Sequence, residues 1–165
     1  MAVEPAPLDV DNLRIIRANV RAFLTRVASA YRATSGRLLD IAPQVHEGAR
    51  PFFPSTVAVE TLDIDPNSGC TYIGDICARN DVLPDGSLIW RILKLGGLVF
   101  ITVPFNFRIH GPLPDCWRFT EHGLRALLHR FTILELEGVP TPNRPLMPIH
   151  YTMVARKPDR PPAPP

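Results

Sequence analysis

The sequence predicts an α/β fold with a mainly parallel sheet. Short apolar runs alternate with helical segments and with loops rich in proline and glycine, which is the pattern of such folds. The run 98–104 (LVFITVP) is apolar at nearly every position, as is typical of a strand buried on both faces of a parallel sheet. The length of 165 residues fits one domain, and 45% hydrophobic with 21% charged residues is ordinary for a globular chain.

The N-terminal part is expected to form one amphipathic helix from Asp9 to Ser35, after a flexible lead-in. Its apolar side chains recur at spacings of three and four, which is the helical period. Asp9 or Asp11 can cap the start, and Gly36 stands where a glycine commonly ends a helix. Several arginines lie off the apolar stripe, and we interpret them as a solvated face of the helix.

Three short apolar runs follow, and each one ends on or near an acid. The runs cover residues 37–42, 57–64 and 70–76, and the acids are Asp40, Asp63 and Asp75. Ligands of parallel α/β sheets bind outside the carboxyl ends of the strands, and a carboxylate can accept both hydrogen bonds of a ribose. One such acid alone is more often the cap of a turn. Three of them on successive strands favour a nucleotide-like ligand.

The remaining elements are less regular. We expect a helix over 88–95, the strand 98–104, a long loop over 105–118, a helix over 120–129, and strands over 131–137 and 149–156. Thr120 is the expected N-cap of its helix, with Glu121 in the first turn. The proline-rich stretch between the last two strands is predicted to be a loop. The expected organisation is an N-terminal helix (1–35), a core (36–157) and a disordered proline-rich tail (158–165).

Composition argues against several other classes of protein. A net charge of +2, spread evenly along the chain, does not favour a nucleic-acid partner. No apolar run approaches the roughly 18 residues that span a membrane, and no signal peptide is visible. Three cysteines without metal-type spacing indicate a reducing, cytoplasmic compartment and no metal site. The chain also has no Ser-His-Asp order, Walker loop or HExxH motif.

The motifs in order are LLDIA, TLDIDP, GDI, LPDGS and LKLGGLVFITVP, and together they resemble the class I S-adenosylmethionine-dependent methyltransferases of the type 11 group. A later stretch, HGPLPDCWRFT (110–120), is similar to a subgroup with a His…Pro-x-Asp-x-Trp-Arg-Phe-Thr pattern. The resemblance covers residues 36–157. It implies a Rossmann-like methyltransferase sheet, mainly parallel with an antiparallel C-terminal strand. It also implies S-adenosyl-L-methionine as cofactor and a small molecule or glycan as methyl acceptor.

The resemblance also assigns the site. Asp63 takes the place of the acid that holds the ribose, and Asp75 that of the acid beside adenine. The cofactor-binding residues that it implies are Asp40, Ala42, Gln44, Asp63, Ile64, Asp75 and Ile76. In the loop before the 120–129 helix, His110 is the first candidate base, Asp115 would orient it, and Arg118 would bind an anionic group of the substrate. His46 is a second candidate base, and each histidine can instead be a simple exposed loop residue.

The sequence departs from the family pattern in two places. Where the family has a glycine-rich loop, this chain reads DIAPQVH from Asp40 to His46. Only the 20 residues 76–95 separate Asp75 from Gly96, whereas a strand–helix–strand unit needs about 30. The fourth strand and the helix after it therefore look deleted. We expect the strand 98–104 to fill the vacant place beside the first strand, giving the order 3-2-1-5 with the last two strands beyond. Pairing with another chain, as in a homodimer, is the alternative repair.

Three functions remain open from the sequence. The first is a methyltransferase acting on a small molecule or glycan. The second is a methyltransferase-like protein without methyl transfer, such as a binding module, a partner subunit or a non-methylating enzyme such as a cyclase. The third, an arginine-rich nucleic-acid binder, has little support because the charge is evenly spread.

Overall fold

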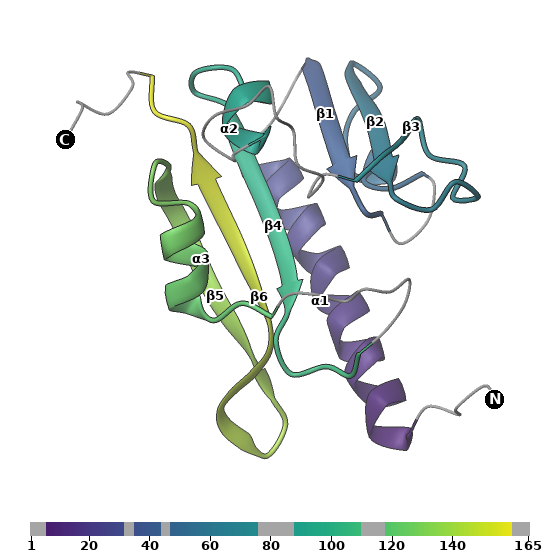
Figure 1. Cartoon of the computed structure of the whole chain (residues 1–165), viewed down its shortest axis with the longest axis vertical. Helices are drawn as coiled ribbons and strands as arrows, with labels where there is room; N and C mark the ends of the chain where they lie inside the picture. The colour runs from purple at the N-terminus through teal and green to yellow at the C-terminus, as the bar shows by residue number, and fades with distance from the viewer. Residues whose placement is uncertain (1–5, 32–34, 44–46, 76–87, 110–117, 160–165) are drawn as a thin grey trace. The chain divides into compact units, whose positions relative to one another are not determined.

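The computed structural model describes residues 6–31, 35–43, 47–75, 88–109 and 118–159. The chain divides into two compact units. One comprises Arg21–Leu88 and is here called the parallel unit; the other comprises Met1–Val20 with Ile89–Pro165 and is called the antiparallel unit. Each unit carries its own three-stranded sheet (Figure 1).

The first helix, α1, spans Pro7–Ala30 and contributes to both units. It confirms the predicted helix but ends earlier than expected. Gly36 does not end it: this glycine has φ +126° and is the first residue of a strand. Phe23 and Val27, from the predicted apolar stripe, are buried. Asn12 is also buried although it is polar.

The parallel unit contains the strands β1 (Gly36–Ile41), β2 (Val57–Asp63) and β3 (Tyr72–Ile73), and a short 3-10 turn, η1 (Arg50–Phe52). The strands pair in parallel in the order β1-β2-β3. Its core holds Ala49, Val57 and Val59, with Leu24, Leu38 and Phe53 packed against them.

The third strand is shorter than the run 70–76 predicts. The Thr71 side chain takes the place of a backbone partner, because its Oγ1 accepts a hydrogen bond from the Thr61 N–H at 3.1 Å. In return, the Thr71 N–H donates to Oγ1 of Thr61 at 3.0 Å. The Thr61 side chain is almost fully buried, so these two bonds satisfy groups that water does not reach.

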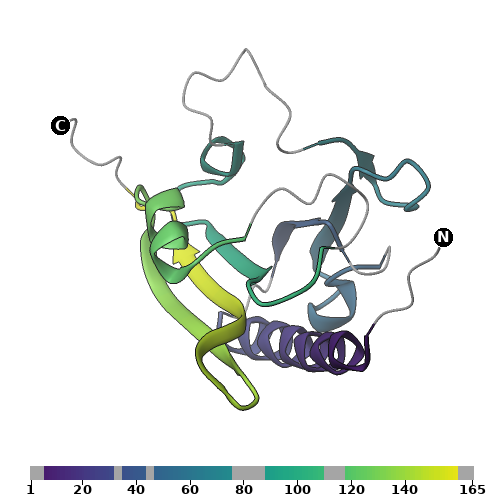
Figure 2. The same ribbon diagram turned by 60° about the horizontal axis from the view of Figure 1, so that its bottom comes forward.

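The antiparallel unit contains β4 (Leu98–Pro104), β5 (Thr132–Thr141) and β6 (Arg144–Arg156), paired in the order β4-β6-β5. Both ladders are antiparallel, so the predicted antiparallel C-terminal strand is confirmed. The helices α2 (Leu88–Ile92) and α3 (Glu121–Leu127) belong to the same part of the chain. α3 lies against the sheet beside β5 in both views (Figure 1, Figure 2).

One face of the antiparallel sheet forms the larger core. Its buried members are Val99, Leu124, Leu128, Phe131, Met153 and Ala155. Trp90 of α2 packs edge-on against Phe131, with ring centroids 5.1 Å apart. Lys157 holds the end of α2, because its ammonium donates to the carbonyls of Trp90 and Leu93 at 2.6 and 2.8 Å. These bonds satisfy carbonyls that a helix end leaves without a partner.

The helix α3 begins as predicted. The Thr120 side chain accepts a hydrogen bond from the Gly123 N–H at 3.1 Å, which makes it the N-cap. Glu121 lies in the first turn, where a negative charge is favourable.

The sequence predicts the sheet order 3-2-1-5 with the last two strands beyond. Within each unit the described strands agree with this order, since β1, β2 and β3 are neighbours in one sheet and β6, then β5, follow β4 in the other. The place of β4 beside β1 concerns the relation between the two units and stays a prediction. Residues 76–87, within the segment where the deletion was inferred, lie outside the described part of the chain.

The prediction of a long loop between the last two strands is wrong, because β5 and β6 extend through the proline-rich stretch and form a hairpin. Prolines are tolerated there for two reasons. Pro140 lies on the outer strand, where the register shifts on both sides of it. Pro145 and Pro148 come before His150, the first residue of β6 that pairs with β4. At these two positions the edge of β6 that faces β4 therefore has no ladder that a proline could interrupt.

No helix among the described residues is long and apolar enough to cross a membrane.

Candidate active site

The carboxyl ends of β1, β2 and β3 lie at one edge of the parallel unit. Register places Asp40 opposite Thr61, and Asp63 opposite Ile73. The Gly74 N–H then donates to the Asp63 carbonyl at 2.9 Å, which brings the segment before Asp75 against the end of β2. The predicted acids on three successive strands are therefore brought to one edge. We call this edge the acid edge.

Directly after β1, the backbone at Ala42 adopts a conformation that glycine favours. Ala42 has φ +55°, in the left-handed region that non-glycine residues rarely adopt. Its N–H donates to the Leu62 carbonyl at 2.8 Å, which holds the turn against the end of β2. The sequence departs from the family at this loop, but Ala42 keeps a conformation that favours glycine.

Asp40 binds its own loop. Its Oδ2 accepts a hydrogen bond from the Ala49 N–H at 2.8 Å, which ties the far end of the loop back to β1. Burial raises the pKa of the Asp40 carboxyl, and the bond from Ala49 opposes this only in part. Gly48, with φ +54°, lets the chain pass directly beside this carboxylate. The contact that the structure shows for Asp40 is thus one that shapes the loop.

Asp63 is the acid best placed for a ligand. Its Oδ1 accepts a hydrogen bond from the Asp65 N–H at 2.9 Å, which fixes the carboxylate plane. Asp65 accepts from the Asn67 N–H at 2.9 Å in the same kind of turn, so the two acids differ in position: Asp63 ends β2, whereas Asp65 lies two residues beyond it and is exposed. In the described part of the chain the other oxygen of Asp63 has no hydrogen-bond partner. One oriented and one available oxygen suit recognition of a hydroxyl group.

Two half-exposed apolar side chains border Asp63. Ile64 was predicted from the sequence and is 51% exposed; Ile73 was not predicted and is 50% exposed. Asp63 and Ile73 are register partners, so both belong to the acid edge. The sequence analysis missed Ile73. The signal that could have found it is an apolar residue at the end of the strand next to the one that Asp63 ends.

Other predicted site residues are less informative. Asp75 is exposed and follows Gly74 at the acid edge. Arg118 lies in the antiparallel unit, where its Nη2 donates to the Arg108 carbonyl at 3.1 Å. The predicted residues Gln44, His46, Ile76, His110 and Asp115 lie outside the described residues. No group of side chains that could hold a metal ion occurs in the ranges that the structure describes.

Replacing Ala42 by glycine is expected to stabilise the chain by about 0.5–1 kcal/mol. Glycine removes the steric penalty of φ +55°, about 1–2 kcal/mol, but loses more backbone entropy on folding. The free energy of unfolding in urea measures the difference. Ala58, exposed on β2, is the matched control, because glycine there should destabilise by a similar amount. A loss of stability in Ala42→Gly would show that the turn carries no strain.

Comparisons with known proteins agree on the fold. No protein-family model and no curated protein matches the sequence. Among solved structures, TehB from Haemophilus influenzae superposes with a TM-score of 0.51 at 17% identity over 79% of this chain. The match covers 60% of TehB, so this chain spans less than two thirds of that protein.

The structure of 1,6-didemethyltoxoflavin-N1-methyltransferase from Burkholderia thailandensis, with bound 1,6-didemethyltoxoflavin and S-adenosylhomocysteine, is also similar. It matches with a TM-score of 0.49 at 20% identity, over 96% of this chain and 94% of that one. At these identities, the likeness to TehB shows the fold alone. It confirms the predicted α/β fold class.

Proposed function

We propose that the chain binds S-adenosyl-L-methionine at the acid edge and transfers its methyl group to a small molecule or glycan. The observation that carries this proposal is the position of the Asp63 carboxylate, which ends β2, is oriented by one backbone bond and lies opposite the exposed Ile73. The sequence motifs that resemble the class I methyltransferases support the same cofactor class.

The residues of the acid edge fit the cofactor. Asp63 would accept hydrogen bonds from the ribose hydroxyls, and Ile64 with Ile73 would cover an apolar face of the adenine. The left-handed turn at Ala42 lets the backbone approach a ligand closely. The bound cofactor supplies the electrophilic methyl group and the leaving group, and this chain supplies positioning.

The acceptor side of the proposal rests on sequence. His110 is the proposed base that removes a proton from a hydroxyl or amine, and Asp115 is the proposed group that orients it. Arg118 is proposed to bind an anionic group of the acceptor, and its bond to the Arg108 carbonyl would fix its direction.

Calorimetry with S-adenosylmethionine and S-adenosylhomocysteine tests the cofactor. We expect Asp63→Ala to weaken binding by about 10- to 100-fold, since a hydrogen bond to a charged group contributes about 1.5–3 kcal/mol. Asp65→Ala is the matched control, because Asp65 is an acid with the same kind of turn bond but lies two residues beyond the end of β2. It should bind nearly as the wild type does.

Two outcomes would count against the proposal. A folded wild-type chain that binds neither compound would exclude this cofactor. Equal losses in the Asp63 and Asp65 variants would show that the loop as a whole, rather than the Asp63 carboxylate, determines binding. Binding without transfer of a labelled methyl group to any small molecule or glycan would instead identify a methyltransferase-like binding protein.

A further inference from the structure

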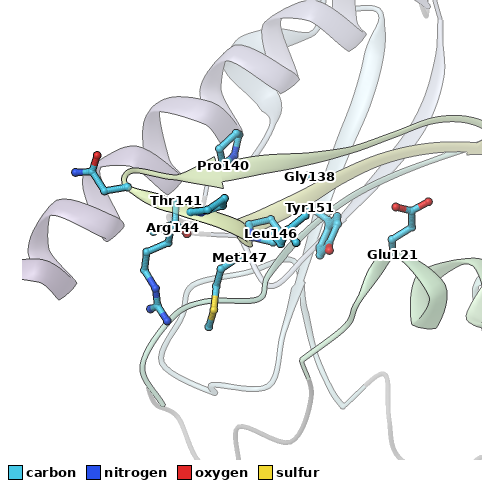
Figure 3. Close-up of a pocket in the computed structure, with 11 residues that line it drawn as sticks. Glu121, Gly138, Pro140, Thr141, Arg144, Leu146, Met147 and Tyr151 are labelled. Atoms are coloured by element: carbon cyan, nitrogen blue, oxygen red, sulfur yellow. The ribbon is translucent and has the colours of Figure 1, made fainter.

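A second concave surface lies wholly within the antiparallel unit, between the β5–β6 hairpin and the start of α3. Its volume is about 530 Å³, within the range of about 300–1,000 Å³ that small-molecule sites occupy. Figure 3 shows Arg144, Met147 and Tyr151 projecting from the hairpin, with Glu121 on α3. We call this surface the hairpin groove.

The position of the groove is fixed by bonds to the segment after β4. The N–H groups of Phe105 and Asn106 both donate to the Ile149 carbonyl, at 3.0 and 3.1 Å. The Asn106 side chain donates to Oγ1 of Thr141 at 3.2 Å. The hairpin is thereby tied to the carboxyl end of β4.

Tyr151 forms the floor of the groove and is held on two sides. Its ring meets that of Phe105 edge-on, with centroids 6.1 Å apart. On the neighbouring strand, a Cβ at Gly138 would lie 3.0 Å from Cε1 of Tyr151, so the absence of a side chain there makes room for the ring. A rigid aromatic floor suits a flat apolar ligand.

The uncompensated charge of the groove is positive. Glu121 is paired, because Arg125 donates to its Oε1 through Nε and Nη2 at 3.1 and 3.0 Å. Arg144 has neither a hydrogen bond nor an ion pair within the described ranges, and it is exposed. The guanidinium is therefore available to an anion in the same groove.

Next to Arg144, the groove is bordered by an exposed apolar side chain, Leu146, whose backbone is strained. Leu146 is fully exposed and has φ +59°. A branched apolar side chain in this conformation is held there by the hairpin, since left-handed backbone costs about 1–2 kcal/mol per residue. Strain of this kind often marks a binding site.

We propose that the hairpin groove binds a small molecule with an apolar ring system and an anionic group. The ring lies on Tyr151 between Met147 and the wall at Leu146, and Arg144 pairs with the carboxylate, sulfonate or phosphate. None of its residues belongs to the acid edge, and the proposal does not depend on the proposed methyl transfer.

Titration with anilinonaphthalene sulfonate, an aromatic anion, tests the groove in the full chain. The readout is the ¹³C-methyl spectrum of the methionines, because Met147 lines the groove whereas Met153 is 0% exposed in the core. We expect the Met147 signal to shift and that of Met153 to stay. Arg144→Gln should weaken the binding about tenfold, as loss of one charge-assisted pair implies.

Two controls separate charge from apolar contact. Phenylnaphthylamine, which has the same rings without the sulfonate, should bind wild type and Arg144→Gln equally. Arg14→Gln removes an exposed arginine of α1 and should bind the sulfonate as the wild type does. An unshifted Met147, or equal sulfonate affinities of wild type and Arg144→Gln, would overturn the proposal. Binding of S-adenosylmethionine alongside either result would leave the cofactor proposal standing.

Discussion

Substitution of Gly48 by alanine is expected to destabilise the chain by about 2–5 kcal/mol. The residue has φ +54°, and an added Cβ would collide with Oδ2 of Asp40 and lie 3.1 Å from Cγ2 of the buried Thr61. Left-handed backbone costs about 1–2 kcal/mol for a non-glycine residue, and overpacking about 1–3 kcal/mol more. Urea unfolding followed by circular dichroism measures the loss.

The collision can be separated from the backbone strain. Asp40→Ala removes the atom that the new Cβ would strike, so the double variant should lose less stability than the two single losses together. Gly74→Ala is the control, because its Cβ would meet nothing within 4 Å and its φ is not in the left-handed region. Strict additivity of Gly48→Ala and Asp40→Ala would show that they do not act through this contact.

These two residues show where sequence reasoning about the site was limited. Asp40 ends an apolar run, as Asp63 does, and the pattern alone assigns both to a ligand. In the structure Asp40 is partly buried and accepts a bond from Ala49, nine residues further along its loop, whereas Asp63 accepts one from Asp65 in a local turn at the end of β2. The difference depends on Gly48, eight residues beyond Asp40, which brings the Ala49 N–H to the carboxylate. Such a return contact leaves no periodic signal in the sequence.

The fold was predictable where one clear sequence pattern determined a strand or a helix. The strand Leu98–Pro104 has the predicted bounds, because a continuous apolar run follows a glycine pair. The hairpin through the proline-rich stretch was not predictable from composition. Proline disfavours a central strand, but Pro140 lies on an outer strand beside register shifts. The position of Pro140 in the sheet depends on tertiary pairing, and this position outweighed the low preference of proline for strands.

The order of the last strands was predicted more successfully. The sequence predicts that the last two strands lie beyond the strand 98–104, and in the structure β4 pairs with β6 along all seven of its residues, with β5 on the other side of β6. An antiparallel ladder to a long strand of the same unit requires no crossover helix.

Acidification below about pH 6.5 is expected to destabilise the chain through His150. This side chain is 1% exposed, and neither ring nitrogen has a hydrogen-bond partner in the described ranges. Burial lowers the pKa of His150 from its ordinary value of 6.5, because the charged form is poorly solvated there. Between the folded pKa and 6.5 the unfolded chain binds the proton and the folded chain does not. The free energy of unfolding therefore falls as the pH falls through that window.

Replacing His150 by leucine separates this effect from general acid sensitivity. Leucine is apolar and similar in size, so removing two buried nitrogens without partners should raise the free energy of unfolding at pH 7 by about 1–3 kcal/mol. The fall in stability from pH 7 to 5 should also become shallower, as measured by urea unfolding at each pH. His122→Gln removes an exposed imidazole of the same unit and should leave the slope unchanged. A His150→Leu chain that is less stable at pH 7, with the wild-type slope, would mean that the imidazole has a stabilising partner in the folded chain. His150 would then contribute to the fold as a bonded polar residue, and the acid sensitivity would have to come from other groups.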